Sequence, residues 1–445
     1  MSEEPAQGTP FAPHTVADTQ AMLDAIGADS EADLFDVPET IAFDGELGIP
    51  ARTELAVRAE LEEQLSANEE LIEFLGRGHY DHYQPAMVDD LAGRSEFLTS
   101  YTQYQPEIAQ GFLQVLFEYQ SMFAELTGLP IVNASMYDAA TALGEAGTMA
   151  TRLRQFSGDT ILVPSQIHEG RLGVLDNYVA GAGLTIETYQ MDDGAADIEA
   201  IREEIDDSCV MLYLESPTVR GVIEPNIEAL VEIADSHDAL CTLGTDPVAL
   251  ALLESPGDLG VDVVVGEAAS LGLPASYGTG LGLFATREAF LRQVPGRLVG
   301  ASVDDDDNRA YTLTLQTREQ HIRRERATSN ICTNQAWVAL RTAMHLAWLG
   351  PTGLVKTASE GVRQASDVAR KMDAIDGISA PAHDRHHIRE FVAETDRNAS
   401  AIVNDLREYG FAIHAIDDHL IQCCITETNA AATDDLLAAL EEVAT

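Results

Sequence analysis

The sequence predicts an α/β protein with a large, mostly parallel sheet, a helical N-terminal region and a small C-terminal α+β domain. Two patterns carry this prediction. Short apolar segments alternate with amphipathic segments between residues 159 and 266, as in a parallel sheet covered by helices. Short strand and helix patterns mix in the tail after residue 389 instead. We therefore expect three parts, residues 1–90, 91–330 and 331–445.

Each element is predicted from its periodicity and its end signals. Two acidic helices are expected in the first part, one stopping at Gly27 and one starting after Pro50. The second part opens with helices over 106–128 and 137–154. Its expected strands cover 159–164, 185–190, 209–216, 240–246 and 262–266, followed by Leu281–Ala285. The third part begins with the helix in "TNQAWVALRTAMHLAWLG" and continues with strands in "REFVAE", "FAIHAI" and "HLIQCCITE".

The charge balance excludes some partners. The net charge is −48, from 26 basic and 74 acidic residues, which disfavours nucleic-acid binding. The acids are spread along the chain, which favours adaptation to a high-salt cytosol over a surface made for a basic partner. The polar N-terminus and the lack of a long apolar run predict a cytoplasmic protein with no membrane contact. The five cysteines show no zinc spacing, so no metal is expected.

A glycine-rich loop follows the strand expected over 262–266. Gly278, Gly280 and Gly282 would let the backbone approach a ligand closely. The loop suits a cofactor, yet it contains no lysine, cysteine or histidine. The whole chain has two lysines, Lys356 and Lys371.

Three long stretches, residues 74–111, 133–146 and 313–336, resemble the glycine decarboxylase family, which is the P-protein of the glycine cleavage system. The resemblance covers nearly the whole chain and is greatest to the α subunit, or N-terminal half, of the two-subunit form. It implies the aminotransferase-like fold of pyridoxal-phosphate (PLP) enzymes, fold type I. The alternation alone leaves a Rossmann-like fold open, although no G-x-G-x-x-G follows the first strand.

The resemblance also implies an activity and its partners. Glycine would be decarboxylated on PLP, and the aminomethyl group would pass to the lipoyl arm of the H-protein. A lysine must hold the cofactor as a Schiff base, and the equivalent position here is Ala269. The two lysines of the chain fall in a later helix. The partner, subunit 2, is therefore expected to carry PLP covalently, in a hetero-oligomer of two of each chain.

Three motifs carry the candidate site residues. His79, Tyr80, His82 and Tyr83 border either the partner's active site or an aromatic packing joint. Tyr101, Thr102, Tyr104 and Gln105 precede a helix and either hold an anion or cap that helix. The third motif faces a carboxylate or the partner, or else pairs with nearby glutamates; it consists of Arg318, His321, Arg323, Arg324 and Asn330.

The remaining polar positions are interpreted as structural. Asn133, Ser135 and Asp138 stand where this fold builds its phosphate cup, but Asp138 indicates an ordinary helix cap. Asp246 matches the aspartate that pairs with the pyridinium nitrogen and is interpreted as a relict. An exposed turn, not a metal site, is expected for His383, His386 and His387.

Three functions are compatible with these residues. The chain is the non-lysine subunit of a glycine decarboxylase, a non-enzymatic scaffold or regulatory paralogue, or an independent PLP enzyme. The tyrosine and arginine clusters favour the first over a bare scaffold, and the lysine count opposes the third.

Overall fold

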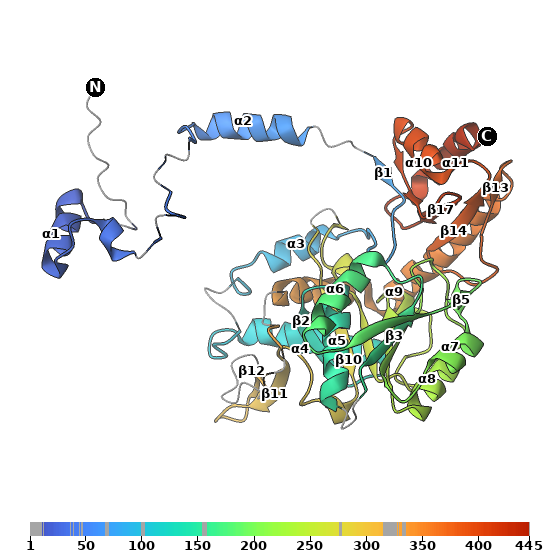
Figure 1. Ribbon diagram of the computed structural model, residues 1–445, viewed down its shortest axis with the longest axis horizontal. Coiled ribbons are helices and arrows are strands. Elements are labelled where there is room, and N and C mark those ends of the chain that lie inside the picture. Colours follow the sequence, from blue (N-terminus) through green and yellow to red (C-terminus); the bar gives the residue numbers. More distant parts are fainter. Residues whose placement is uncertain are drawn as a thin grey trace. The chain divides into compact units, whose positions relative to one another are not determined.

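The computed structural model describes most of the chain, and its contacts divide the chain into two units, residues 1–69 and 70–445 (Figure 1). The described residues are 11, 13–35, 37–38, 40–43, 45, 48–66, 71–98, 103–153, 158–275, 278–314, 327, 329–331 and 335–444.

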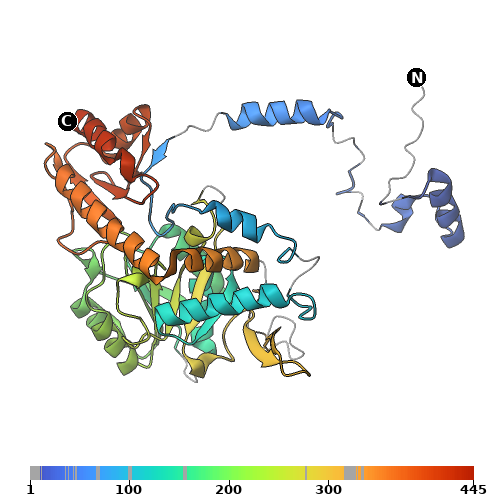
Figure 2. The same cartoon turned by 180° about the vertical axis from the view of Figure 1, so that it is seen from behind.

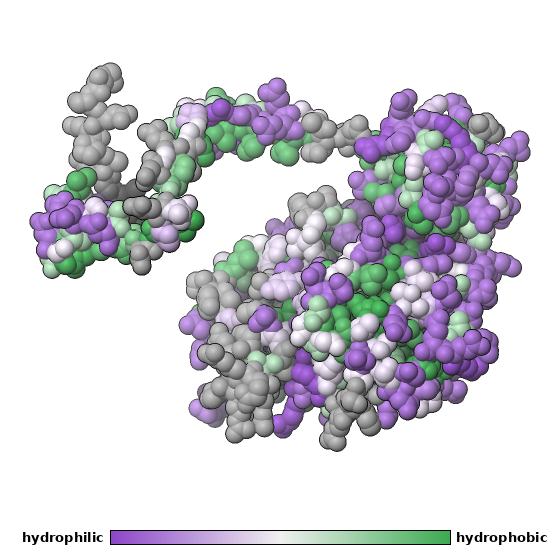
Figure 3. Space-filling view, viewed as in Figure 1, coloured by the Kyte–Doolittle hydropathy of each residue, from purple (hydrophilic) through white to green (hydrophobic). Residues whose placement is uncertain are grey.

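The described residues of the first unit form two helices and a short 3-10 turn. Helix α1 (Val16–Ile26) starts at a Thr15 capping box and ends at Gly27, whose φ of 74° is left-handed. Helix α2 (Glu54–Leu65) follows the turn η1 (Glu31–Leu34). Among the described residues of this unit, Leu23 is the one buried side chain. Apolar atoms lie exposed along α2 (Figure 3).

The second unit is built on a seven-stranded sheet, as the alternation predicted. The strand order is β2-β10-β9-β8-β7-β3-β4, and all neighbours are parallel except those of β10. The bounds are β2 (Ile131–Met136), β3 (Thr160–Pro164), β4 (Thr185–Tyr189), β7 (Cys209–Glu215), β8 (Leu240–Thr245), β9 (Val263–Glu267) and β10 (Gly282–Thr286). Strands β7, β8 and β9 are buried along their whole length, which explains their unbroken apolar runs.

Helices cover both faces of this sheet. One face carries α5 (Ala139–Leu153) and α6 (Glu169–Ala180), which pack on each other (Figure 1). The other face carries α4 (Gln110–Thr127) and the first half of α9 (Ala336–Met372), seen from behind in Figure 2. Helices α7 (Ile198–Glu204) and α8 (Ile227–Ser236) bury Ile201 and Leu230 in the core of that face. Helix α9 is broken at Gly350, which is non-helical and precedes Pro351.

The C-terminal part forms a second sheet with its own core. Its order is β13-β14-β17-β16, packed by the second half of α9, α10 (Ala399–Glu408) and α11 (Thr433–Val443). The strand bounds are β13 (Ile378–Ser379), β14 (Glu390–Thr395), β16 (His414–Ala415) and β17 (Leu420–Cys424).

Several elements escaped the sequence prediction. Strand β1 (Ile72–Glu73) pairs with β15 (Phe411–Ala412), so residues just after the first unit join the C-terminal part. The helix expected from residue 106 begins at Gln110. Strands β2 and β13 were not expected either. The same holds for the hairpins β11–β12 (Val299–Val303, Arg309–Leu313) and β5–β6 (Met191–Asp192, Ala195–Ala196) and the helix α3 (Ala86–Ala92). No described helix has the length and apolarity to cross a membrane.

Candidate active site

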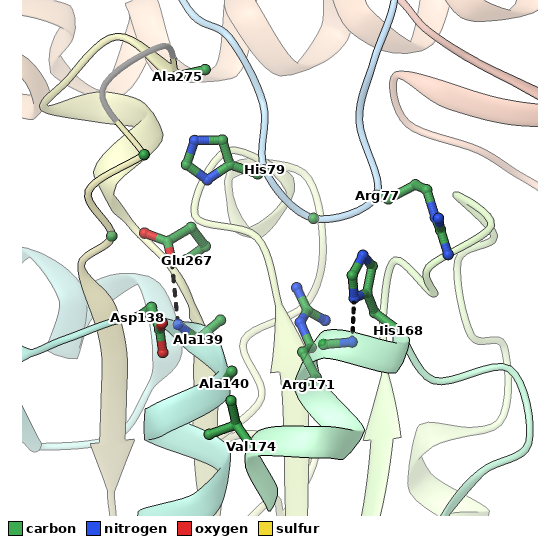
Figure 4. Close-up of a pocket in the computed structure, with 14 residues that line it drawn as sticks. Arg77, His79, Asp138, Ala139, Ala140, His168, Arg171, Val174, Glu267 and Ala275 are labelled. Atoms are coloured by element: carbon green, nitrogen blue, oxygen red, sulfur yellow. Dashed lines mark hydrogen bonds between the residues drawn. The ribbon is translucent and has the colours of Figure 1, made fainter. Parts of the chain in front are cut away.

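A cavity of about 420 Å³ lies where α5 and α6 begin and β9 ends (Figure 4). The carboxyl ends of parallel strands meet at this edge, which is where α/β folds place ligands. The lining residues are Arg77, Gly78, His79, Asp138, Ala139, Ala140, His168, Gly170, Arg171, Val174, Glu267, Ala275, Gly278 and Gly280.

The loop after β9 contains a carboxylate at its start and no lysine. Glu267 ends β9, and Ala269 begins the short 3-10 turn η3 (Ala269–Leu271) with its side chain buried. The Glu267 carboxylate accepts three backbone N–H groups, from Ala269 (3.0 Å), Leu281 (2.7 Å) and Ala139 (3.2 Å). Ala139 is the first residue of α5, so Glu267 occupies the anion position at that helix N-terminus. Burial raises the pKa of Glu267.

Asp246, at the end of β8, is held in a buried ion pair. The Arg389 guanidinium donates to its Oδ2 at 2.6 Å, and the Ala249 N–H donates to the same oxygen at 2.7 Å. Arg389 also lies over the Tyr80 ring, 4.3 Å from the ring centroid. The other oxygen, Asp246 Oδ1, has no hydrogen-bond partner in the described part of the chain.

The first motif divides between the cavity and the protein interior. His79 lies beside the cavity above Glu267 (Figure 4). Tyr80 is buried, and its hydroxyl donates to Glu390 at 2.6 Å. Gly78 has a φ of 92°, and a Cβ there would collide with the Arg171 guanidinium. The glycine therefore lets this loop close over Arg171.

The other two residues of the motif form a joint with the C-terminal part. His82 is buried, and its Nδ1 lies 3.0 Å from Glu427. Burial raises the pKa of Glu427, but the contacts with His82 outweigh burial and lower this pKa to about 2. Tyr83 is exposed and lies 6.4 Å from Trp348, measured between ring centroids. These contacts tie the motif to the C-terminal part and to α9.

The second and third motifs are described only in part. Tyr104 is half-buried with the Arg297 guanidinium 4.9 Å from its ring centroid, and Gln105 and Asn330 are exposed. None of these three lines the cavity described above. The remaining predicted residues lie outside the described part of the chain: Tyr101, Thr102, Arg318, His321, Arg323 and Arg324.

Two of the structural interpretations need correction. Asn133 and Ser135 lie inside β2, not at the helix start. The Asn133 side chain donates to the carbonyls of Pro295 and Arg297 and so anchors the loop that contains them. Asp138 alone stands at the start of α5, where it accepts from the Thr141 N–H at 2.6 Å.

The histidine turn is less exposed than predicted. His386 is exposed, but His383 and His387 are partly buried because the turn packs against the main domain through a bridge between His387 and Val222. Burial lowers the pKa of His387 to about 4. In the described residues, no group of three or more histidine, cysteine, aspartate or glutamate side chains could hold a metal.

Five residues of this site escaped the sequence analysis: Arg77, Glu267, His168, Arg171 and Arg389. Glu267 directly follows the strand whose end was searched for a lysine, so its position was the available signal. His168 and Arg171 lie at the start of α6, a helix whose sequence indicated only its periodicity. Arg389 reaches Asp246 across 143 residues of sequence, which no local pattern indicates.

These residues do not fit PLP as a resident cofactor of this chain. No lysine follows β9, the helix N-terminus already holds the Glu267 carboxylate, and Asp246 already pairs with Arg389. Lys356 is exposed on α9, and Lys371 on the same helix pairs with Asp367 and Asp434. A dianionic phosphate beside Glu267 and Asp138 would be repelled.

Comparison with known proteins gives a consistent set of relatives. The glycine cleavage system P-protein family matches residues 10–440. A probable glycine dehydrogenase (decarboxylating) subunit 1 of Halobacterium salinarum is 56% identical over 98% of this chain and 99% of its own length. The subunit of the same name from Pyrococcus furiosus is 45% identical over 81% of this chain and 82% of its own.

Solved structures agree with these relatives. A glycine decarboxylase (P-protein) of the glycine cleavage system, crystallised in inhibitor-bound form, has a TM-score of 0.85 and 37% identity, covering 98% of this chain and all of that one. A sphingosine-1-phosphate lyase of Burkholderia pseudomallei has a TM-score of 0.67 at 14% identity, covering 91% of this chain and 94% of that one. The second likeness shows the fold alone, and the expected PLP-enzyme fold type I is confirmed.

Proposed function

Because this chain belongs to the glycine cleavage system P-protein family, we propose that it is the subunit of glycine dehydrogenase that works without a Schiff-base lysine of its own. A second subunit supplies that lysine and holds PLP. Together the two chains decarboxylate glycine and transfer the aminomethyl group to the lipoyl arm of the H-protein. The assembly contains two of each chain.

The loop after β9 is the observation that supports this proposal most directly. It has the position and glycines of a cofactor loop, but Glu267 and Ala269 stand where a reactive lysine would be needed. The scaffold alternative draws on the same observation. It differs in predicting that the partner is equally active without this chain.

Reconstitution of the enzyme tests the proposal. The purified chain, mixed with PLP and glycine, is expected to release no carbon dioxide and to show no Schiff-base absorbance. Adding the lysine-bearing subunit should produce both. Schiff-base absorbance with this chain alone would make it an independent PLP enzyme. Full activity of the partner alone would make this chain a scaffold.

We also propose that Arg323 and Arg324 face the partner or an anion in its site. Exposed intrachain ion pairs contribute about 0–1 kcal/mol, whereas a charge pair in a partly dry interface contributes about 2–5 kcal/mol. Arg323→Ala or Arg324→Ala should therefore leave the chain folded and cut complex formation at least tenfold. Arg363→Ala, which removes an exposed pair with Glu360 on α9, is the control. Normal assembly of both test variants would place the cluster on open surface.

A further inference from the structure

The cavity of Figure 4 is more than the remnant of a cofactor site, because its wall contains both hydrogen-bond donors and carboxylates. On one side it presents the side chains of Arg77 and His168, while His79 lies above Glu267. The Nδ1 atom of His168 accepts the Gly170 N–H at 3.0 Å, so in the neutral ring the proton is on Nε2. On the other side lie the carboxylates of Glu267 and Asp138. Donors and acceptors thus face each other across the space.

A chamber of about 10 Å³, room for roughly one water-sized group, adjoins the cavity. Cavity and chamber share Gly78, Arg171 and Glu267 in their walls. Asp246 and Thr218 also line the chamber, and both are more than nine-tenths buried. Within the described part of the chain, Asp246 Oδ1 and Thr218 Oγ1 have no hydrogen-bond partner.

Unpartnered buried oxygens indicate a missing donor. A buried polar atom without a partner costs about 1–3 kcal/mol, so these two oxygens favour a group that donates hydrogen bonds from within the chamber. An ammonium group has the size of a water and carries three donors. The arginine of the chamber wall does not oppose it, because Arg171 is paired with Glu215 at 2.7 Å.

The cavity wall sets the other end of the ligand. Arg77 and His168 suit a carboxylate, while Glu267 and Asp138 repel a phosphate from the N-terminus of α5. We propose that this cavity binds a small amino-acid zwitterion, with its ammonium group in the chamber of Asp246 and Thr218 and its carboxylate toward Arg77 and His168.

Titration calorimetry of the full chain alone, in molar potassium chloride, tests the proposal. The probes are glycine, β-alanine and γ-aminobutyrate, which hold the two charges progressively farther apart. Acetate and methylamine each carry one of the charges, and inorganic phosphate tests the old cofactor chemistry. At least one zwitterion should bind at least tenfold more tightly than acetate, methylamine and phosphate.

Two variants locate the binding. Thr218→Val removes the chamber hydroxyl at nearly constant volume and should weaken zwitterion binding about tenfold. The matched control is Thr242→Val, because Thr242 is also buried with an unpartnered hydroxyl in the described chain but lies on β8 away from the cavity lining. It should bind like the wild type.

Arg77→Gln covers the case in which Thr218→Val does not fold. It keeps the backbone N–H that donates to Glu390 and should weaken only ligands that carry a carboxylate. The proposal is overturned if no zwitterion binds, if phosphate binds more tightly than every zwitterion, or if the variants that fold bind as the wild type does. Because no partner or PLP is present, these results stand whether or not reconstitution supports the proposed enzyme.

Discussion

Asp246 and Glu267 stand at the ends of the neighbouring strands β8 and β9, yet the protein stabilises their carboxylates in different ways. Asp246 is matched by a full positive charge, the Arg389 guanidinium at 2.6 Å. Glu267 is matched by three backbone N–H groups, one of them at the start of α5. Each thereby fills a position that a cofactor would contact.

The comparison shows which of the two carboxylates depends on a single other residue for its stabilisation. A buried ion pair has lost its hydration, so removing one partner leaves an uncompensated charge. A carboxylate held by several backbone groups loses less with any one of them, because the others and the helix dipole remain. We therefore expect the β8 position to be fragile and the β9 position to be tolerant.

The largest effect should come from Arg389→Leu. The variant leaves Asp246 buried without its counter-charge, which should lower the free energy of unfolding by about 3–5 kcal/mol. Urea denaturation followed by circular dichroism measures this change. Arg363→Leu removes an exposed pair with Glu360 and should cost at most about 1 kcal/mol. Adding Asp246→Asn to Arg389→Leu should recover part of the loss. Equal losses for Arg389→Leu and Arg363→Leu would contradict the comparison.

The next largest effect concerns the pH dependence of stability and His345, a histidine of α9. His345 is buried, and burial lowers its pKa from 6.5 to about 4. Since the unfolded chain binds this proton at a higher pH, stability should fall as pH drops from about 6.5 to about 4, by at most about 3 kcal/mol from this group. His345→Gln should flatten the stability curve in that window. The exposed His386→Gln should not, and identical curves for His345→Gln and the wild type would refute the assignment.

The fold was predictable where its signal is local. Strand β8 was expected over 240–246 and runs over Leu240–Thr245, because a strand buried on both faces is a continuous apolar run. Strand β1 could not be predicted, because its two residues pair with Phe411 and Ala412 and carry no periodicity of their own. Only the folded chain brings those segments together.

The candidate site, too, was predictable only where its signal is local in the sequence. A loop without a lysine could be found from composition alone, and Asp246 from its place after an apolar run. That Arg389 neutralises Asp246 is a tertiary fact, since the arginine arrives from the C-terminal part. His79 and Tyr80 are adjacent in sequence, yet one borders the cavity and the other is buried under Arg389. The sequence therefore predicted the motif, but not which of its residues borders the cavity and which is buried.

Removing the Glu267 side chain should have a moderate effect. Glu267→Ala leaves three backbone N–H groups without their acceptor, but the adjoining cavity admits water to them. We expect a loss of about 1–3 kcal/mol in the free energy of unfolding. The same change clears the N-terminus of α5, so inorganic phosphate should raise the melting temperature of the variant and not of the wild type. A phosphate response of equal size in both proteins would show that Glu267 does not occupy the anion position.

The smallest effect should come from Glu267→Gln, which keeps the shape of the side chain. The single amide oxygen can still accept from Ala269 and Leu281, but the amide nitrogen cannot accept from Ala139. One lost hydrogen bond costs about 0.5–1.5 kcal/mol, and relief from burying a charge offsets part of that cost.

The pH dependence of stability is the sharper test of this variant. Burial raises the folded pKa of Glu267, so its contribution to stability is present below the unfolded pKa and is lost as pH rises through the folded one. Burial also raises the pKa of Glu145, Glu224 and Glu390. Glu267→Gln should therefore show a smaller decline above pH 4.5 than the wild type, whereas Asp138→Asn, at the same helix start, should keep the full decline. A wild-type curve without the decline, or a Glu267→Gln curve that keeps the full decline, would mean that the β9 carboxylate is not the desolvated group that its three N–H contacts indicate.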